Sequence, residues 1–103
     1  MVTYRMWVPN RMGRADLHFN AGEITKISVV HITVSEATAL DSVQLLGGQT
    51  FVPHFGDASI TLQNVSVRDG GVDFNVFVDF SRPLHLVTDI TIMDPPAQII
   101  IGS

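Results

Sequence analysis

Residues 60–80 read ITLQNVSVRDGGVDFNVFVDF, and this stretch decides the fold class. Two runs rich in β-branched and aromatic residues flank Asp69 and Gly70, a pair that marks a two-residue β-hairpin turn. The register set by this turn separates apolar from polar residues, with Val67 opposite Val72, Val65 opposite Phe74, Ser66 opposite Asp73 and Asn64 opposite Asn75. Ile60 and Leu62 fall out of phase with these pairs, which predicts a bulge near residues 63–64.

Residues 84–92 predict a third strand beside this hairpin. The shortest antiparallel connection through residues 81–83 sets Phe80 opposite Leu84 and Asp79 opposite His85. The resulting three-stranded meander has one apolar face and one outer face, the latter made by Asn64, Ser66, Asp73, Asn75, Phe77, Asp79, His85, Val87, Asp89 and Thr91.

The rest of the chain also has β patterning. Residues 3–8 and 15–20 alternate cleanly, and residues 24–34 change phase, which predicts a bulge or a strand that switches sheets. Residues 35–42 (SEATALDS) predict one short helical turn capped by Ser35. Further strands are expected at residues 43–46, at 50–55, which Pro53 places at a sheet edge, and at 98–101 as an edge strand or an apolar arm.

This pattern predicts an all-β fold with eight to nine strands and one short helical turn. The expected architecture is a single-domain antiparallel β-sandwich over residues 1–103, Ig-like or jelly-roll-like in outline. A chain of 103 residues is long enough to bury one core without disulfides, so the absence of cysteine is compatible with this fold.

The composition narrows the classes of function. Six Lys and Arg against ten Asp and Glu give a net charge of -4, which argues against nucleic acid as a partner. Without cysteine there is no thiol catalysis and no thiolate zinc site. We expect no membrane partner, because no signal peptide or transmembrane segment is visible, and a cytoplasmic location is favoured. A chain whose signal had been removed would look the same.

The outer face of the meander predicts a non-catalytic, lectin-like binding module. Carboxylate and amide groups around an aromatic ring are the residue types that bind a saccharide. Trp7 is the only tryptophan, and it faces outward with Arg5, as a stacking platform or an interface anchor unless both faces of its strand are covered. The alternative for the whole face is an ordinary solvated sheet surface. The predicted ligand-binding residues are Trp7, Asp73, Asn75, Phe77, Asp79, His85 and Asp89.

The sequence supports metal binding and catalysis less than it supports saccharide binding. The four histidines are dispersed and lack the short spacing of paired metal ligands, and no calcium-loop motif accompanies the aspartates, although calcium is left open. Asp79 and His85 are interpreted as a cross-strand ion pair, because no nucleophile elbow or oxyanion hole accompanies them. We therefore expect no enzymatic activity, no cofactor and no catalytic residue.

A second hypothesis concerns assembly. The apolar fraction of 46% is high for a small chain with only 16% charged residues, which indicates a self-association surface. Edge strands together with an apolar C-terminal arm would then make a homo-oligomer, with Ile99, Ile100 and Ile101 at the interface. The sequence leaves open whether saccharide binding, assembly or some other role applies.

Overall fold

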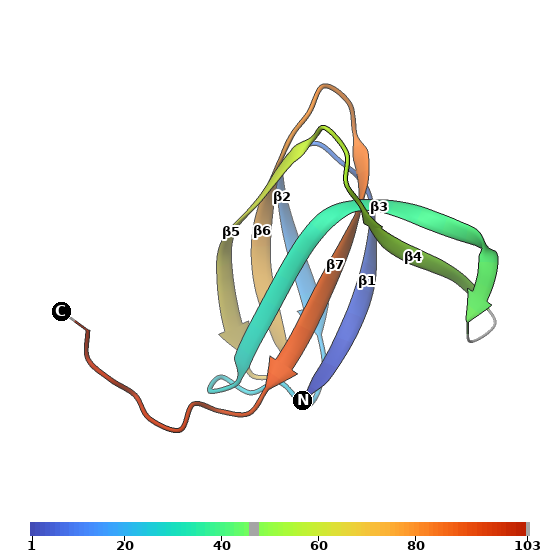
Figure 1. The fold of residues 1–103 in the computed structure, drawn as a ribbon. Coiled ribbons are helices and arrows are strands. Elements are labelled where there is room, and N and C mark those ends of the chain that lie inside the picture. Colours follow the sequence, from blue (N-terminus) through green and yellow to red (C-terminus); the bar gives the residue numbers. More distant parts are fainter. Residues whose placement is uncertain (46–47, 103) are drawn as a thin grey trace.

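The chain folds into two antiparallel β-sheets (Figure 1). The computed structural model describes the backbone of residues 1–45 and 48–102, and the side chains of residues 1–38 and 51–102. The four-stranded sheet has the order β1 (Val2–Arg11), β7 (Leu84–Met93), β3 (Val29–Leu45) and β4 (Gly48–His54). The three-stranded sheet has the order β2 (Gly13–Asn20), β6 (Gly71–Asp79) and β5 (Ser59–Arg68). The described residues contain no helix that is long and apolar enough to cross a membrane.

One apolar cluster joins the inner faces of both sheets. Even-numbered residues of β6 and β7 dominate it, as period-two alternation requires when one face of each strand is buried. The strands β1 and β2 contribute Val8, Ala15 and Leu17, in agreement with the predicted alternation of both strands. The buried apolar residues are Val8, Ala15, Leu17, Ile24, Val72, Phe74, Val76, Val78, Leu84, Leu86, Ile90 and Ile92.

The predicted hairpin is confirmed, since β5 and β6 pair in the register that sets Arg68 opposite Gly71. Gly70 has φ of 85°, a left-handed conformation that glycine adopts without strain. The predicted bulge is confirmed as well, because the ladder shifts register between Leu62 and Asn64. Both features depend on neighbouring residues, so the local sequence was sufficient to find them.

The predicted pairing of residues 71–79 with 84–92 is wrong. β7 lies between β1 and β3 in the other sheet, and the link at residues 81–83 crosses from one sheet to the other. The alternation of β7 fits a strand beside β6 and a strand facing it across the core equally well, because either position buries the same even-numbered residues.

The predicted helical turn at residues 35–42 is wrong too. β3 runs without interruption through this segment, and Glu36 to Leu40 pair with residues 50–54 of β4. Strand pairing with β4 outweighs a helix signal that rests on one capping serine. The described residues hold seven strands rather than eight or nine, since residues 43–45 belong to β3 and residues 98–101 form no strand.

The second half of β3 leaves the body of the molecule together with β4. Residues 29–36 of β3 pair with β7, and from Glu36 onward the partner is β4 (Figure 1). β4 is an edge strand, as Pro53 predicts, because proline has no N–H to give a further neighbour.

Candidate functional site

The structure distributes the seven predicted ligand-binding residues over two sheets. Asp73, Asn75, Phe77 and Asp79 belong to β6 in the three-stranded sheet. Trp7, His85 and Asp89 belong to β1 and β7 in the four-stranded sheet. The single continuous face that the meander predicted is therefore absent, and each group has its own surroundings.

Trp7 is held inside an aromatic cluster on the outer face of the four-stranded sheet. Its ring stacks on Phe51 of β4 with centroids 4.3 Å apart, and the His85 ring lies 4.8 Å away. Val87, the register partner of Trp7, has only 2% of its surface exposed although it faces away from the core. Trp7 thus fixes β4 to the sheet, with one ring face covered by Phe51.

His85 does not pair with Asp79. Its Nδ1 accepts a hydrogen bond from the backbone N–H of Asn10 at 3.2 Å, and its ring packs against Trp7. The predicted cross-strand ion pair is therefore wrong, because Asp79 and His85 lie in different sheets.

Asp89 is engaged by Arg5. The guanidinium donates two hydrogen bonds to the carboxylate, at 2.7 Å from Nε and 2.8 Å from Nη2, and a third from Nη1 to the carbonyl oxygen of Phe51 at 2.9 Å. These bonds from Arg5 lower the pKa of Asp89 and raise the pKa of Arg5. The pair secures β4, and both oxygens of Asp89 are already in use.

Asp73 lies at the centre of a polar cluster on the three-stranded sheet. Nδ1 of His18 lies 2.7 Å from one carboxylate oxygen, and Nε of Arg68 lies 3.1 Å from the other. The hydrogen bond from His18, followed by that from Arg68, lowers the pKa of Asp73. Arg68 also donates to the side-chain oxygen of Asn20 at 2.7 Å, so the cluster links all three strands of the sheet.

Asn75 is a buried polar residue with 5% of its surface exposed. Its Oδ1 accepts a hydrogen bond from Asn64 at 3.0 Å, and its Nδ2 donates one to Oε1 of Gln63 at 2.9 Å. The bulge in β5 brings both partners opposite one residue of β6. Asn75 therefore stabilises the bulge, and Phe77, 40% exposed, is the open aromatic ring of this strand.

Two shallow depressions meet along β2 and bring part of the predicted set together. One has a volume of about 350 Å³ and is lined by Arg14, Asp16, His18, Asn64, Ser66, Asp73, Phe74 and Asn75. The other has a volume of about 250 Å³ and is lined by Met6, Trp7, Val8, Pro9, Arg11, Asp16, Leu17 and His18. Because Asp16 and His18 line both, Trp7 and Asp73 border neighbouring parts of one surface, which we call the β2 groove.

The sequence reasoning missed Asp16, His18 and Arg14 as members of this groove. It placed Asp16 and His18 on an outward face, and the structure agrees. It could not pair β2 with β6, because that contact joins residues far apart in the chain with no turn to signal it.

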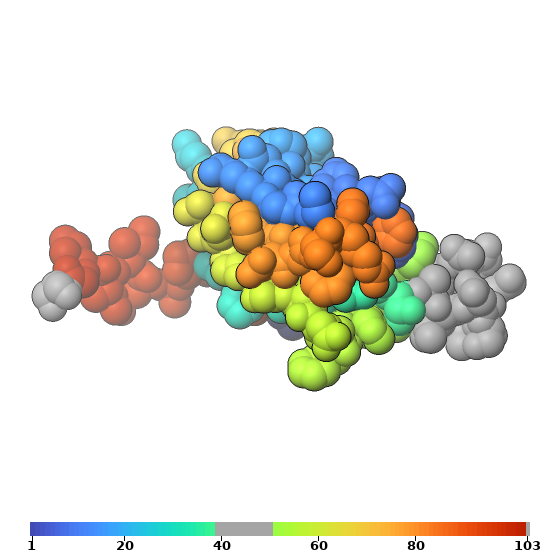
Figure 2. Space-filling view, turned by 90° about the horizontal axis from the view of Figure 1, so that it is seen from above, coloured from blue at the N-terminus to red at the C-terminus, as the bar shows by residue number. Residues whose placement is uncertain are grey.

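The apolar arm is the other prominent feature of the surface. Residues 97–101, which we call the C-terminal arm, form no strand and stand clear of the body (Figures 1 and 2). Ile99, Ile100 and Ile101 have 89%, 78% and 96% of their surface exposed.

No family model, curated protein or solved structure matches the chain. Within the described residues, no group of three or more His, Asp or Glu side chains is placed to hold a metal ion.

Proposed function

We propose that this protein is a non-catalytic assembly subunit that associates with copies of itself through the C-terminal arm. The carrying observation is the exposure of Ile99, Ile100 and Ile101, each at least 78% exposed on an extended segment. Burying apolar surface is favourable by about 25 cal/mol per Å², so three consecutive isoleucines are more stable when a protein interface covers them than when they face water. Exchange of an identical segment between copies of one chain is a low-cost route to an oligomer.

A charge in the arm tests this function. Ile99→Asp should shift a self-associated protein towards monomer in sedimentation velocity, because an unpaired carboxylate resists burial. Ile27→Asp is the matched control, since Ile27 is 59% exposed but lies outside the arm, and it should leave association unchanged. Equal sedimentation of the wild type and Ile99→Asp as monomers at high concentration would refute the proposal.

We also infer a jelly-roll-like sandwich as the fold of a single domain over residues 1–103. In support, the first two strands pair with the last two: β1 pairs with β7 in one sheet, and β2 pairs with β6 in the other. An Ig-like order is less compatible, because it would put the first two strands in one sheet, and here they lie in different sheets. One shared apolar cluster supports a single domain.

Saccharide binding at the β2 groove is the second candidate function. The observation that favours it is that Trp7 and Asp73 border two adjoining depressions, and that Asp16 and His18 line both of them. Such groups bind sugars by hydrogen bonds and ring stacking. Self-association would place several such sites in one particle, which raises the overall affinity of a weak site for a multivalent ligand.

A glycan array followed by titration calorimetry tests the groove. His18→Ala should abolish the heat of binding of any saccharide that the array identifies, whereas Phe55→Ala, at a fully exposed ring elsewhere, should not change it. An array without binding, or equal heats for both variants, would remove this candidate.

A further inference from the structure

The two sheets meet along a seam between β3 and β5, which approach each other without pairing. In the described part of the chain, residues 29–35 of β3 pair only with β7 and β5 pairs only with β6, so each strand has one unpaired edge. Apolar side chains on and beside these strands pack against the core but are only partly buried, namely Val30, Ile32, Val34, Ala58, Ile60 and Leu62. Unpaired backbone beside half-buried apolar side chains is the surface to which an additional extended segment binds.

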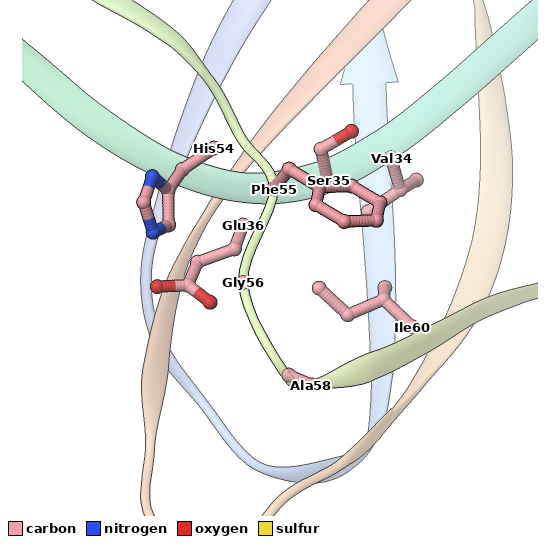
Figure 3. A pocket seen from close by; sticks show the side chains of 8 residues that line it. All are labelled: Val34, Ser35, Glu36, His54, Phe55, Gly56, Ala58 and Ile60. Carbon is pink, nitrogen blue, oxygen red and sulfur yellow. The ribbon is translucent and has the colours of Figure 1, made fainter.

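A pocket of about 170 Å³ lies at the end of this seam, where the chain passes from β4 to β5. Val34 and Ile60 are on one side of it, and Glu36 and His54 are on the other (Figure 3). A cavity of about 150 Å³ holds a molecule of the size of benzene, so this pocket has room for an aliphatic side chain.

The C-terminal arm supplies an apolar segment for the half-buried apolar side chains of the seam. It has no charged side chain, and its three consecutive isoleucines favour an extended conformation. In that conformation Ile99 and Ile101 share one side, so the arm presents an apolar face to a seam while its backbone meets an unpaired edge.

Pro95 and Pro96 direct the arm away from its own body. Proline fixes its own φ and disfavours the helical region for the residue before it, so Asp94 and Pro95 are both held extended. The arm accordingly continues outward from the end of β7 instead of reversing along β3 (Figure 1). This direction makes the seam of a second copy the natural receptor.

We propose that the C-terminal arm of a second copy docks along the seam between β3 and β5 and places an isoleucine side chain in the pocket beside Val34 and Ile60. This inference rests on the proposed assembly function and adds the receptor surface to it. Each copy carries both an arm and a seam, so either two copies exchange arms in a closed dimer or successive copies join head to tail.

Disulfide trapping tests the receptor directly, because the chain has no cysteine of its own. Ile99→Cys protein mixed with Ala58→Cys protein should give a disulfide-linked pair on oxidation, because Ile99 is on the side of the arm that faces the seam. We expect a yield roughly tenfold above random collision, since docking raises the local concentration. The matched control replaces Ala58→Cys with Met12→Cys, since Met12 is 53% exposed and lies at the corner between β1 and β2.

The outcomes separate this inference from the proposed function. Preferred trapping at Ala58→Cys supports it, and Ala58→Phe, which fills the pocket, should then raise the dissociation constant by about tenfold. If the protein self-associates but the disulfide yield is the same at Met12→Cys as at Ala58→Cys, the proposed assembly function stands and the seam is not the receptor. A doubly substituted chain that links to itself as a monomer shows that the arm docks on its own copy and overturns the inference. A wild type that stays monomeric overturns both.

Discussion

At the scale of single residues, the outward polar side chains mainly hold the fold together. Asp73, Asn75 and Asp89 each have polar partners within the chain, at distances of 2.7 to 3.1 Å. A polar pattern on the outside of a strand therefore marks both ligand sites and internal networks, and the sequence does not distinguish them.

Asn75 gives the first prediction at this scale. Asn75→Ala should lower the free energy of unfolding by about 1 to 3 kcal/mol, because it removes the two hydrogen bonds of the buried amide, each worth about 0.5 to 1.5 kcal/mol. Urea denaturation measures this change. Asp79→Ala, at an exposed residue on the same strand, is the control, and an equally small effect of both variants would contradict the structural role of Asn75.

Asp89 gives a prediction about pH. Its pKa in the folded protein is lowered by Arg5 below the ordinary 3.8, so the ionised form stabilises the fold above that value, and this stabilisation is lost as the pH falls through the folded pKa. Urea denaturation at about pH 6 and at about pH 3 should show a smaller loss of stability for Asp89→Asn than for the wild type. The same loss in both proteins would show that the pair with Arg5 contributes nothing.

At the scale of elements, β4 is attached to the body by side chains on the outer face of the sheet. Trp7 stacks on Phe51, and Arg5 reaches the carbonyl oxygen of the same residue. These contacts explain why the sole tryptophan faces away from the core and is still partly buried.

A double-mutant cycle tests this attachment. Trp7→Ala and Phe51→Ala should each destabilise the protein, and the double variant should cost less than their sum by about 0.5 to 1.5 kcal/mol, the coupling of an aromatic pair. Denaturation curves of the four proteins give the coupling energy. Strict additivity would show that the stacking does not hold β4.

The elements also show where prediction from sequence succeeds. The turn at Gly70 and the bulge in β5 follow from adjacent residues, and both were found. The position of β7 was missed because Leu86 and Ile90 are buried equally by a neighbour in the same sheet and by a sheet across the core. The length of β3 depends on its pairing with β4, and the local sequence of residues 35–42 contains no signal for this pairing.

At the scale of the whole molecule, the sites predicted from sequence had different outcomes. The predicted saccharide-binding face does not exist as one surface. Its residues belong to two sheets, because the prediction paired β6 with β7. The exposure of Ile99 to Ile101 agrees with an apolar arm, since composition and position alone indicated it. The β2 groove depends on contacts between distant strands and needed the structure.

Size-exclusion chromatography coupled to light scattering, on the wild type and on a chain lacking residues 97–103, tests the central claim most directly. We predict that the wild type gives a mass above that of the 103-residue chain which rises with concentration, and that the shortened protein stays folded and monomeric. A wild type that remains monomeric at the highest concentration, or an oligomer that survives removal of the arm, would contradict the account.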